Sequence, residues 1–179
     1  MCKGIRRDMP VKVPLRYLPT RLTRKDKKRQ AQMLLKSRKL YKQHQYFTRK
    51  KVSSFKSKPS PHVADAIRIY KLKQGKHSKP NVKPSQELMK ATGCSMQVLN
   101  KIVQKGEGAY FSSGSRPNQS AQSWGLARLA SAVTGGKAAA VDYKIISEGC
   151  QHNKKAFKLA EKARKEYGKG HGHTKRVIL

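Results

Sequence analysis

The side chains that could do chemistry in this sequence are mainly cationic. The 179 residues include 42 Lys and Arg against 9 Asp and Glu, which gives a net charge of +33. Because such a surplus repels itself, it indicates a polyanionic partner, with nucleic acid first, then an acidic protein or an anionic membrane surface. Lysines outnumber arginines 29 to 13, which favours neutralising phosphate over reading bases. We expect the anion contacts in two basic runs: Lys25, Lys27, Lys28, Arg29, Arg49, Lys50 and Lys51.

A second candidate contact lies at residues 85–105, where two short helices are expected on either side of Gly93. A glycine in such a turn, with apolar residues that pack the helices together, is typical of a DNA-reading helix-turn-helix. Met89 argues against this motif, because its position usually holds a small residue. A plain helical hairpin is the commoner alternative. In a reader, the outward side chains would include two amides, which can pair with adenine edges, and one cation: Gln97, Asn100 and Lys101.

Residues 110–119, YFSSGSRPNQ, carry a single charge in a strongly basic chain. With the glycines of residues 106–108 before them, their backbone amides could cradle an anion, and Arg116 is the one candidate for a specific contact. Glycine, however, more often only shapes a turn. We therefore expect a loop or a short hairpin near 107–118, with a mainly structural role.

Catalysis is not expected. A hydrolase or nuclease needs paired carboxylates, a metal cluster, or a nucleophile beside a base. The sequence has no HExxH, Walker or GxSxG pattern. The remaining enzymatic hypothesis is an anion-cradling site around Glu107 and Arg116. We expect no cofactor, no metal and no small-molecule substrate.

The three cysteines indicate reduced thiols. Cys2, Cys94 and Cys150 are odd in number, widely spaced and without a CxxC pair, which is typical of a cytosolic or nuclear compartment. The Cys150-x-His152 spacing lacks the paired ligands of a structural zinc site. The first ten residues have no apolar h-region, so no secretory signal is expected. No run approaches the roughly 18 apolar residues of a membrane span.

These side chains must be positioned by a small, mainly helical fold. Helical spacing of apolar residues predicts about five to seven short helices, with extended basic arms at the N- and C-terminal ends. Gly106 is expected to end the helix over 95–106. The helix over 120–135 is expected to supply the core: Trp124, Leu126, Leu129 and Val133. The predicted N-caps are Thr23, Ser60, Ser85, Ser95 and Ser120.

The charge is unevenly distributed along the chain. Residues 1–58 have a net charge of +18, residues 59–106 of +7, residues 107–150 of +1 and residues 151–179 of +7. We therefore expect three parts. A basic arm with one helix occupies 1–58, a helical core module occupies 59–150, and a basic helix and tail occupy 151–179.

The sequence KGEGAYFSSGSRPNQSAQSWGLARLASAVTGGKAAAVDYKI, residues 105–145, resembles a small uncharacterised protein family of large eukaryotic DNA viruses, of the chlorella-virus and mimivirus kind. YLPTRLTRKDKKRQAQML (17–34), YFTRKKVSSFKSKPS (46–60) and ELMKATGCS (87–95) are also similar to it, so the resemblance covers roughly residues 15–160. It implies no activity and no site residues. It does imply a context, a virion or a viral factory in a reducing cytoplasm.

Charge layout and resemblance together predict a non-enzymatic virion protein. We expect a minor capsid component whose basic arms anchor a packed helical module to neighbouring capsid proteins or anionic internal surfaces. It would lie in the virion, and in the host cytoplasm or nucleus during assembly. The alternative is a DNA-binding or genome-condensing protein that uses the helix-turn-helix at 85–105.

Overall fold

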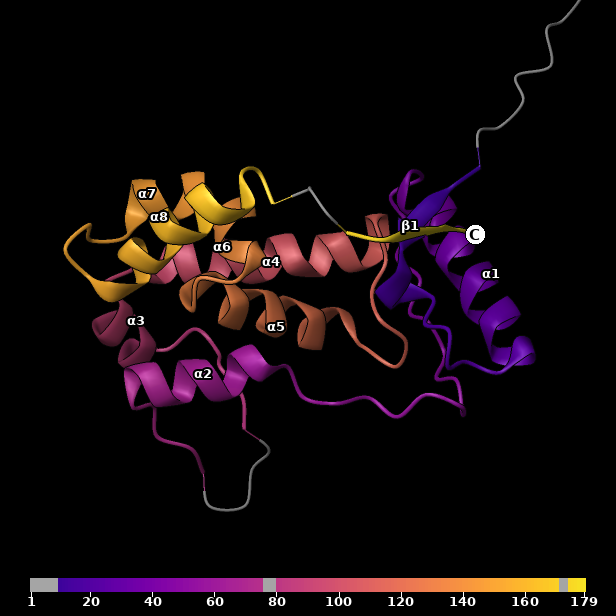
Figure 1. The fold of residues 1–179 in the computed structure, drawn as a ribbon, viewed down its shortest axis with the longest axis horizontal. Coiled ribbons are helices and arrows are strands. Elements are labelled where there is room, and N and C mark those ends of the chain that lie inside the picture. Colours follow the sequence, from indigo (N-terminus) through magenta and orange to yellow (C-terminus); the bar gives the residue numbers. More distant parts are fainter. Residues whose placement is uncertain (1–9, 76–79, 171–173) are drawn as a thin grey trace, which may run out of the picture.

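Helices dominate the computed structural model, which describes residues 10–75, 80–170 and 174–179. Eight α-helices lie in these ranges, one more than the upper expectation, and the mainly helical fold class is confirmed (Figure 1). No helix in the described ranges is long and apolar enough to cross a membrane. The helices are α1 (Arg24–Tyr41), α2 (Pro61–Tyr70), α3 (Gln86–Thr92), α4 (Met96–Ser112), α5 (Ala121–Val133), α6 (Lys137–Val141), α7 (Tyr143–Gly149) and α8 (Lys155–Tyr167). The remaining elements are the strands β1 (Lys12–Pro14) and β2 (Arg176–Ile178) and the 3-10 helix η1 (Leu15–Tyr17).

Four helices begin at hydroxyl caps that the sequence predicts. Each cap accepts a hydrogen bond from the backbone N–H three residues later, which satisfies one free donor of the first turn. At Ser120 the Ser123 hydroxyl also accepts from the cap's own N–H, which completes a capping box. Local sequence therefore sets these helix starts. The four caps are Thr23, Ser85, Ser95 and Ser120.

Helix α4 continues through the position where the sequence predicts a stop. Gly106 is buried inside α4, which extends to Ser112, so the loop or hairpin expected near 107–118 is wrong over its first half. A Cβ on Gly106 would stand 2.6 Å from the Gly125 Cα of α5, and a Cβ on Gly125 would stand 2.7 Å from the Val103 carbonyl oxygen. The two glycines let the helices cross closely, which offsets the low helix propensity of glycine.

The main apolar core surrounds α5, which contacts α2, α4, α6 and α8. Leu129 and Val133 are buried in it, as predicted. Trp124 and Leu126 are only partly buried. Trp124 belongs instead to a separate cluster, where α5 meets the N-terminal part of the chain with Val13, Tyr17 and Leu34.

The two described ends of the chain pair with each other. Strands β1 and β2 are antiparallel, with Lys12 opposite Ile178 and Pro14 opposite Arg176. The Arg176 guanidinium also donates to the Lys12 carbonyl oxygen at 2.8 Å. Val13 is fully buried between these residues. The described parts of the two expected arms are therefore fixed to each other by backbone hydrogen bonds.

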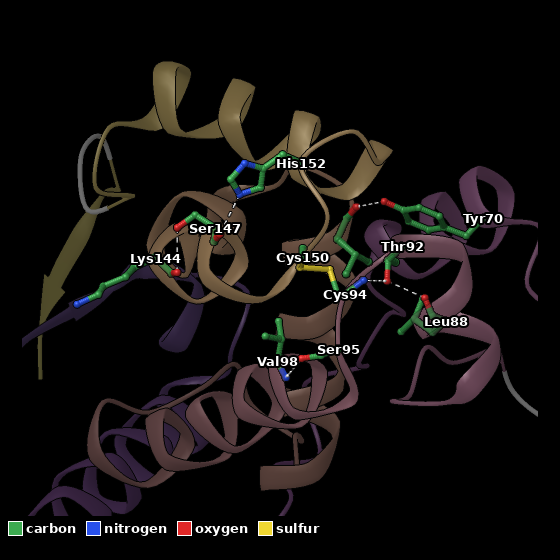
Figure 2. Close-up of a disulfide and its surroundings, with 11 residues drawn as sticks. Tyr70, Leu88, Thr92, Cys94, Ser95, Val98, Lys144, Ser147, Cys150 and His152 are labelled. Carbon is green, nitrogen blue, oxygen red and sulfur yellow. Dashed lines mark hydrogen bonds between the residues drawn. A yellow bond between two sulfur atoms is a disulfide. The ribbon is translucent and has the colours of Figure 1, made fainter.

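A disulfide joins Cys94 in the α3–α4 turn to Cys150 at the end of α7 (Figure 2). The reduced thiols expected for these two residues are therefore wrong, while Cys2 lies outside the described residues. The pair is separated by 56 residues, so no short motif reveals it. The fold brings the two segments together, and beside the disulfide the Ser95 N–H donates to the Gly149 carbonyl oxygen at 2.9 Å.

Candidate anion-binding surface

Helix α1 presents several cations to solvent. Its inward positions recur every three or four residues, so the positions between them face outward. The inward side chains are Asp26, Gln30, Met33, Leu34 and Ser37. Four of the predicted anion contacts occupy outward positions and are exposed: Lys25, Lys27, Lys28 and Arg29.

A second chain segment lies along α1 and adds two cations. At one end the Lys36 ammonium of α1 lies 4.8 Å from the centre of the Phe47 ring. Further along, Val52 joins Met33 in a small apolar cluster. Between Phe47 and Val52 lie two of the predicted anion contacts, Lys50 and Lys51, and both are exposed. We define the basic α1 surface as Lys25, Lys27, Lys28, Arg29, Lys50 and Lys51.

Asp26 is the one acid between residues 10 and 58, and its carboxylate is turned inward. It is 6% exposed, and it accepts hydrogen bonds from the Ser54 hydroxyl at 2.6 Å and the Ser54 N–H at 2.8 Å. These bonds lower the pKa of Asp26 below its ordinary value, so the group is ionised at neutral pH. The lysines of this segment therefore have no exposed local acid to pair with.

Arg49 is not a surface contact, because it is buried with 8% exposed. Its guanidinium donates to the Tyr110 carbonyl oxygen at 2.9 Å, to Ser37 Oγ at 3.1 Å and to Ser115 Oγ at 2.7 Å. It also lies 3.7 Å from the centre of the Tyr110 ring. Burial lowers the pKa of Arg49, but arginine starts so high that it keeps its charge. The anion contact predicted at Arg49 is therefore wrong: acceptors distant in the sequence turn this side chain inward, unlike its neighbour Lys50.

The loop after α4 fixes the basic segment in place through its polar side chains. Asn118 has a left-handed backbone, with φ 59°. Its Oδ1 accepts from the Val52 N–H at 2.8 Å, and its Nδ2 donates to the Phe55 carbonyl oxygen at 2.6 Å. The alternative of an anion cradle at residues 106–108 does not fit, because these residues lie inside α4 and their amides donate within the helix.

Four cations meet beside this loop, and the sequence points to only one of them, Arg116. Arg116 is exposed and lines a depression of about 260 Å³ with Pro19, Phe55 and Ser57. Three further cations complete the lining: Arg16, Arg21 and Lys58. Partial desolvation of the guanidinium, and then the charges of Arg16 and Arg21, lower the pKa of Arg116. The sequence does not reveal this cluster, because Arg16 and Arg116 are 100 positions apart and only the fold brings them together.

The predicted DNA-reading side chains lie on α4. Gln97, Asn100 and Lys101 are exposed, and their spacing places them on one side of the helix. Gly93 has the left-handed backbone of a turn, with φ 71°. The turn itself is covered, since a Cβ on Gly93 would meet the Lys154 side chain at 2.5 Å. The three outward side chains are therefore accessible, while the turn packs against the start of α8.

One protein family matches most of the chain. A family of unknown function (DUF5824) matches residues 14–155. The chain belongs to this family. The DUF5824 match runs from β1 to the first residue of α8, so it includes both the basic α1 surface and the arginines around the depression. No curated protein and no solved structure matches the chain.

The most buried acid of this DUF5824 member has a structural role. Asp142 is fully buried. Its carboxylate pairs with Arg128 of α5 at 2.7 Å and with Lys105 of α4 at 2.8 Å. In the described parts of the chain, no three His, Cys, Asp or Glu side chains come together as a metal ion would require.

Proposed function

We propose that this protein is a non-enzymatic virion component, a minor capsid protein of a large DNA virus. The observation that carries the proposal is the separation of charge from packing. The basic α1 surface is exposed while the one acid of the same segment, Asp26, is buried. The resemblance of residues 105–145 to a family of large DNA viruses supplies the viral context.

The basic surface needs anions to offset its self-repulsion. In a virion these are acidic faces of neighbouring capsid proteins, the packaged nucleic acid, or an anionic internal membrane surface. The helices from α2 to α8 form the packed module, and the basic ends anchor it. The protein lies in the virion, and in the host cytoplasm or nucleus during assembly.

Quantitative mass spectrometry of purified, delipidated virions tests this proposal. We expect the protein at a fixed ratio to the major capsid protein in independent preparations. Cross-linking of intact virions should also join Lys27 and Lys50 to other virion components. Absence of the protein from purified virions would contradict the proposal.

A second candidate function is DNA binding or genome condensation. It is favoured by the exposed amides of Gln97 and Asn100 on the same side of α4 as Lys101. Binding titrations on specific and random duplexes at several salt concentrations test it. In a reader, Asn100→Ala loses about 1–3 kcal/mol of discrimination between sequences, whereas Lys101→Ala weakens both duplexes. An unchanged sequence preference in both variants would exclude reading by α4.

A further inference from the structure

Three arginines surround one depression near the loop that follows α4. They come from η1, from the loop before α1 and from the loop after α4, and Lys58 is the fourth cation. Among the described residues, no carboxylate forms an ion pair with any of the four side chains. Like charges that converge in this way raise the free energy of the empty site, and a bound anion lowers it. The arginines are Arg16, Arg21 and Arg116.

Aromatic rings position two of these guanidinium groups. Arg21 lies over Phe55, 4.5 Å from the ring centre, and Arg16 lies over Tyr17, 5.7 Å from the ring centre. Both rings are buried, each with 6% exposed, so they are fixed by the small apolar clusters beneath them. A guanidinium that is held before binding loses less conformational entropy when the ligand arrives.

The neighbours of Arg116 hold its backbone. Ser115 is fully buried. It accepts a hydrogen bond from Arg49 at 2.7 Å and donates one to the Arg116 carbonyl oxygen at 2.8 Å. Asn118 anchors the other side of the loop to residues 52–55. The third arginine is thus delivered to the depression by a loop that buried hydrogen bonds fix on both sides.

We propose that this depression binds a doubly charged phosphate group, as inorganic phosphate or as a phosphomonoester. A guanidinium fork matches two phosphate oxygens, and three guanidinium groups around one site favour an anion with two charges over a phosphodiester with one. The volume of about 260 Å³ lies just below the roughly 300–1,000 Å³ of sites for drug-sized ligands, which suits a phosphate with a small attached group. The inference rests on the depression alone and holds whether or not the protein is part of a virion.

Thermal unfolding of the full chain with inorganic phosphate, against sodium chloride at equal ionic strength, tests the proposal. We expect phosphate to raise Tm further than chloride does, because a ligand that binds only the folded state stabilises it. Calorimetry should then show that Arg116→Gln and Arg21→Gln each bind phosphate about tenfold more weakly than the natural sequence does. Far-UV circular dichroism checks that each variant is folded, and the second substitution gives the answer if the first does not fold.

Arg24→Gln is the matched control, because it removes an exposed arginine that neither lines the depression nor belongs to the basic α1 surface. It should bind phosphate as the natural sequence does. Equal stabilisation by chloride, or an equal loss of binding in Arg24→Gln, would overturn the proposal, since either result means general charge screening.

Two further ligands identify the source of the phosphate group. Adenosine 5′-monophosphate represents a nucleotide, and soluble inositol trisphosphate represents a lipid headgroup. Tighter binding of either one, abolished in Arg116→Gln, supports the proposal and names the source. Failure of both ligands and of inorganic phosphate to bind would overturn it.

Discussion

The helices from α2 to α8 and the part of the chain around α1 bury their side chains in different ways. In the helical module, one large apolar cluster extends from Ala66 to Ala163, and paired glycines let α4 and α5 pack closely. Around α1 the apolar clusters are small, and buried polar side chains such as Arg49 and Asp26 join the segments. Figure 1 shows these two parts at opposite ends of the molecule, with β1 beside α1.

This difference explains where the charge lies. Close packing of small apolar residues leaves little room for cations in the centre of the module, where residues 107–150 have a net charge of only +1, whereas residues 59–106 and 151–179 have +7 each. Around α1, a few buried hydrogen bonds fix the chain, so most of the cations stay in solvent. The loop at 113–119 links the two parts, because it follows α4 and binds the basic segment through the neutral side chains of Ser115 and Asn118. The basic surface therefore depends on neutral residues for its shape.

Removing the disulfide should have the largest effect on the helical module. The double variant Cys94→Ala, Cys150→Ala opens a loop of 56 residues, and chain entropy predicts a loss of about 4 kcal/mol in the free energy of unfolding. Urea denaturation measures this loss. In the double variant, hydrogen exchange should show a larger loss of protection in α3 and α7 than in α1.

Reducing agent provides the control for the disulfide. It should lower the urea midpoint of the natural sequence and leave the double variant unchanged. A natural sequence that is insensitive to reductant would contradict a stabilising role of Cys94–Cys150.

Gly106→Ala should destabilise the module by about 3 kcal/mol, because the new Cβ meets the Gly125 backbone and forces α4 away from α5. Gly108→Ala is the matched control in the same helix. There the nearest atom is the Tyr41 hydroxyl at 3.8 Å, so higher helix propensity should stabilise the protein by up to about 1 kcal/mol. Urea denaturation compares the two variants. If both substitutions stabilise the protein, the close crossing of α4 and α5 is wrong.

Arg49→Gln should cost about 2–3 kcal/mol, because it leaves the buried Tyr110 carbonyl oxygen and two serine hydroxyls without their donor. Lys50→Gln, one residue further, should change stability by no more than about 0.5 kcal/mol, because its side chain is exposed. Thermal unfolding of both variants measures the difference. Similar losses for neighbouring positions would mean that Arg49 has no special structural role.

A mild acid sensitivity is the smallest effect that we expect. Burial lowers the pKa of His62, whose Nδ1 lies 3.0 Å from Thr134 Oγ1. As the pH falls, His62 therefore binds a proton in the unfolded chain before it does so in the folded chain. The contribution of His62 to the free energy of unfolding is fully present above about pH 6.5 and is lost as the pH drops toward the lower folded pKa. Asp26 adds a further loss below about pH 4, because its folded pKa is also lowered.

His62→Gln tests the first of these two steps. Urea midpoints across the pH range should lose their slope just below pH 6.5 in this variant and keep the step that Asp26 causes. A natural sequence whose midpoint is constant between pH 7 and 5 would contradict the assignment to His62.

The sequence predicts those features that depend on neighbours along the chain. Thr23 and Ser95 cap helices because the donors that they accept lie three residues away. Likewise, the inward spacing along α1 is enough to predict that Lys25 and Lys28 are exposed.

Features that depend on partners distant in the chain cannot be predicted from the local sequence. Gly106 has the same local pattern as a helix stop, and only the approach of Gly125 explains why the helix continues. Arg49 lies in a basic run like its neighbours, yet Ser115, 66 residues away, helps to bury it. The arginines around the depression are likewise brought together by tertiary structure.

The central claim is that the basic α1 surface, rather than the overall charge of the chain, binds polyanions. The salt dependence of polyanion binding tests this claim most directly. The probe is a random-sequence DNA duplex, and the variant replaces Lys25, Lys27, Lys28, Lys50 and Lys51 by Gln. The control replaces five exposed lysines in and after α8, which changes the net charge equally: Lys155, Lys158, Lys162, Lys165 and Lys169. We predict that the slope of log affinity against log salt falls by about 0.9 for each phosphate that the first variant no longer neutralises, and changes little in the second. Equal slopes in the two variants would contradict the claim.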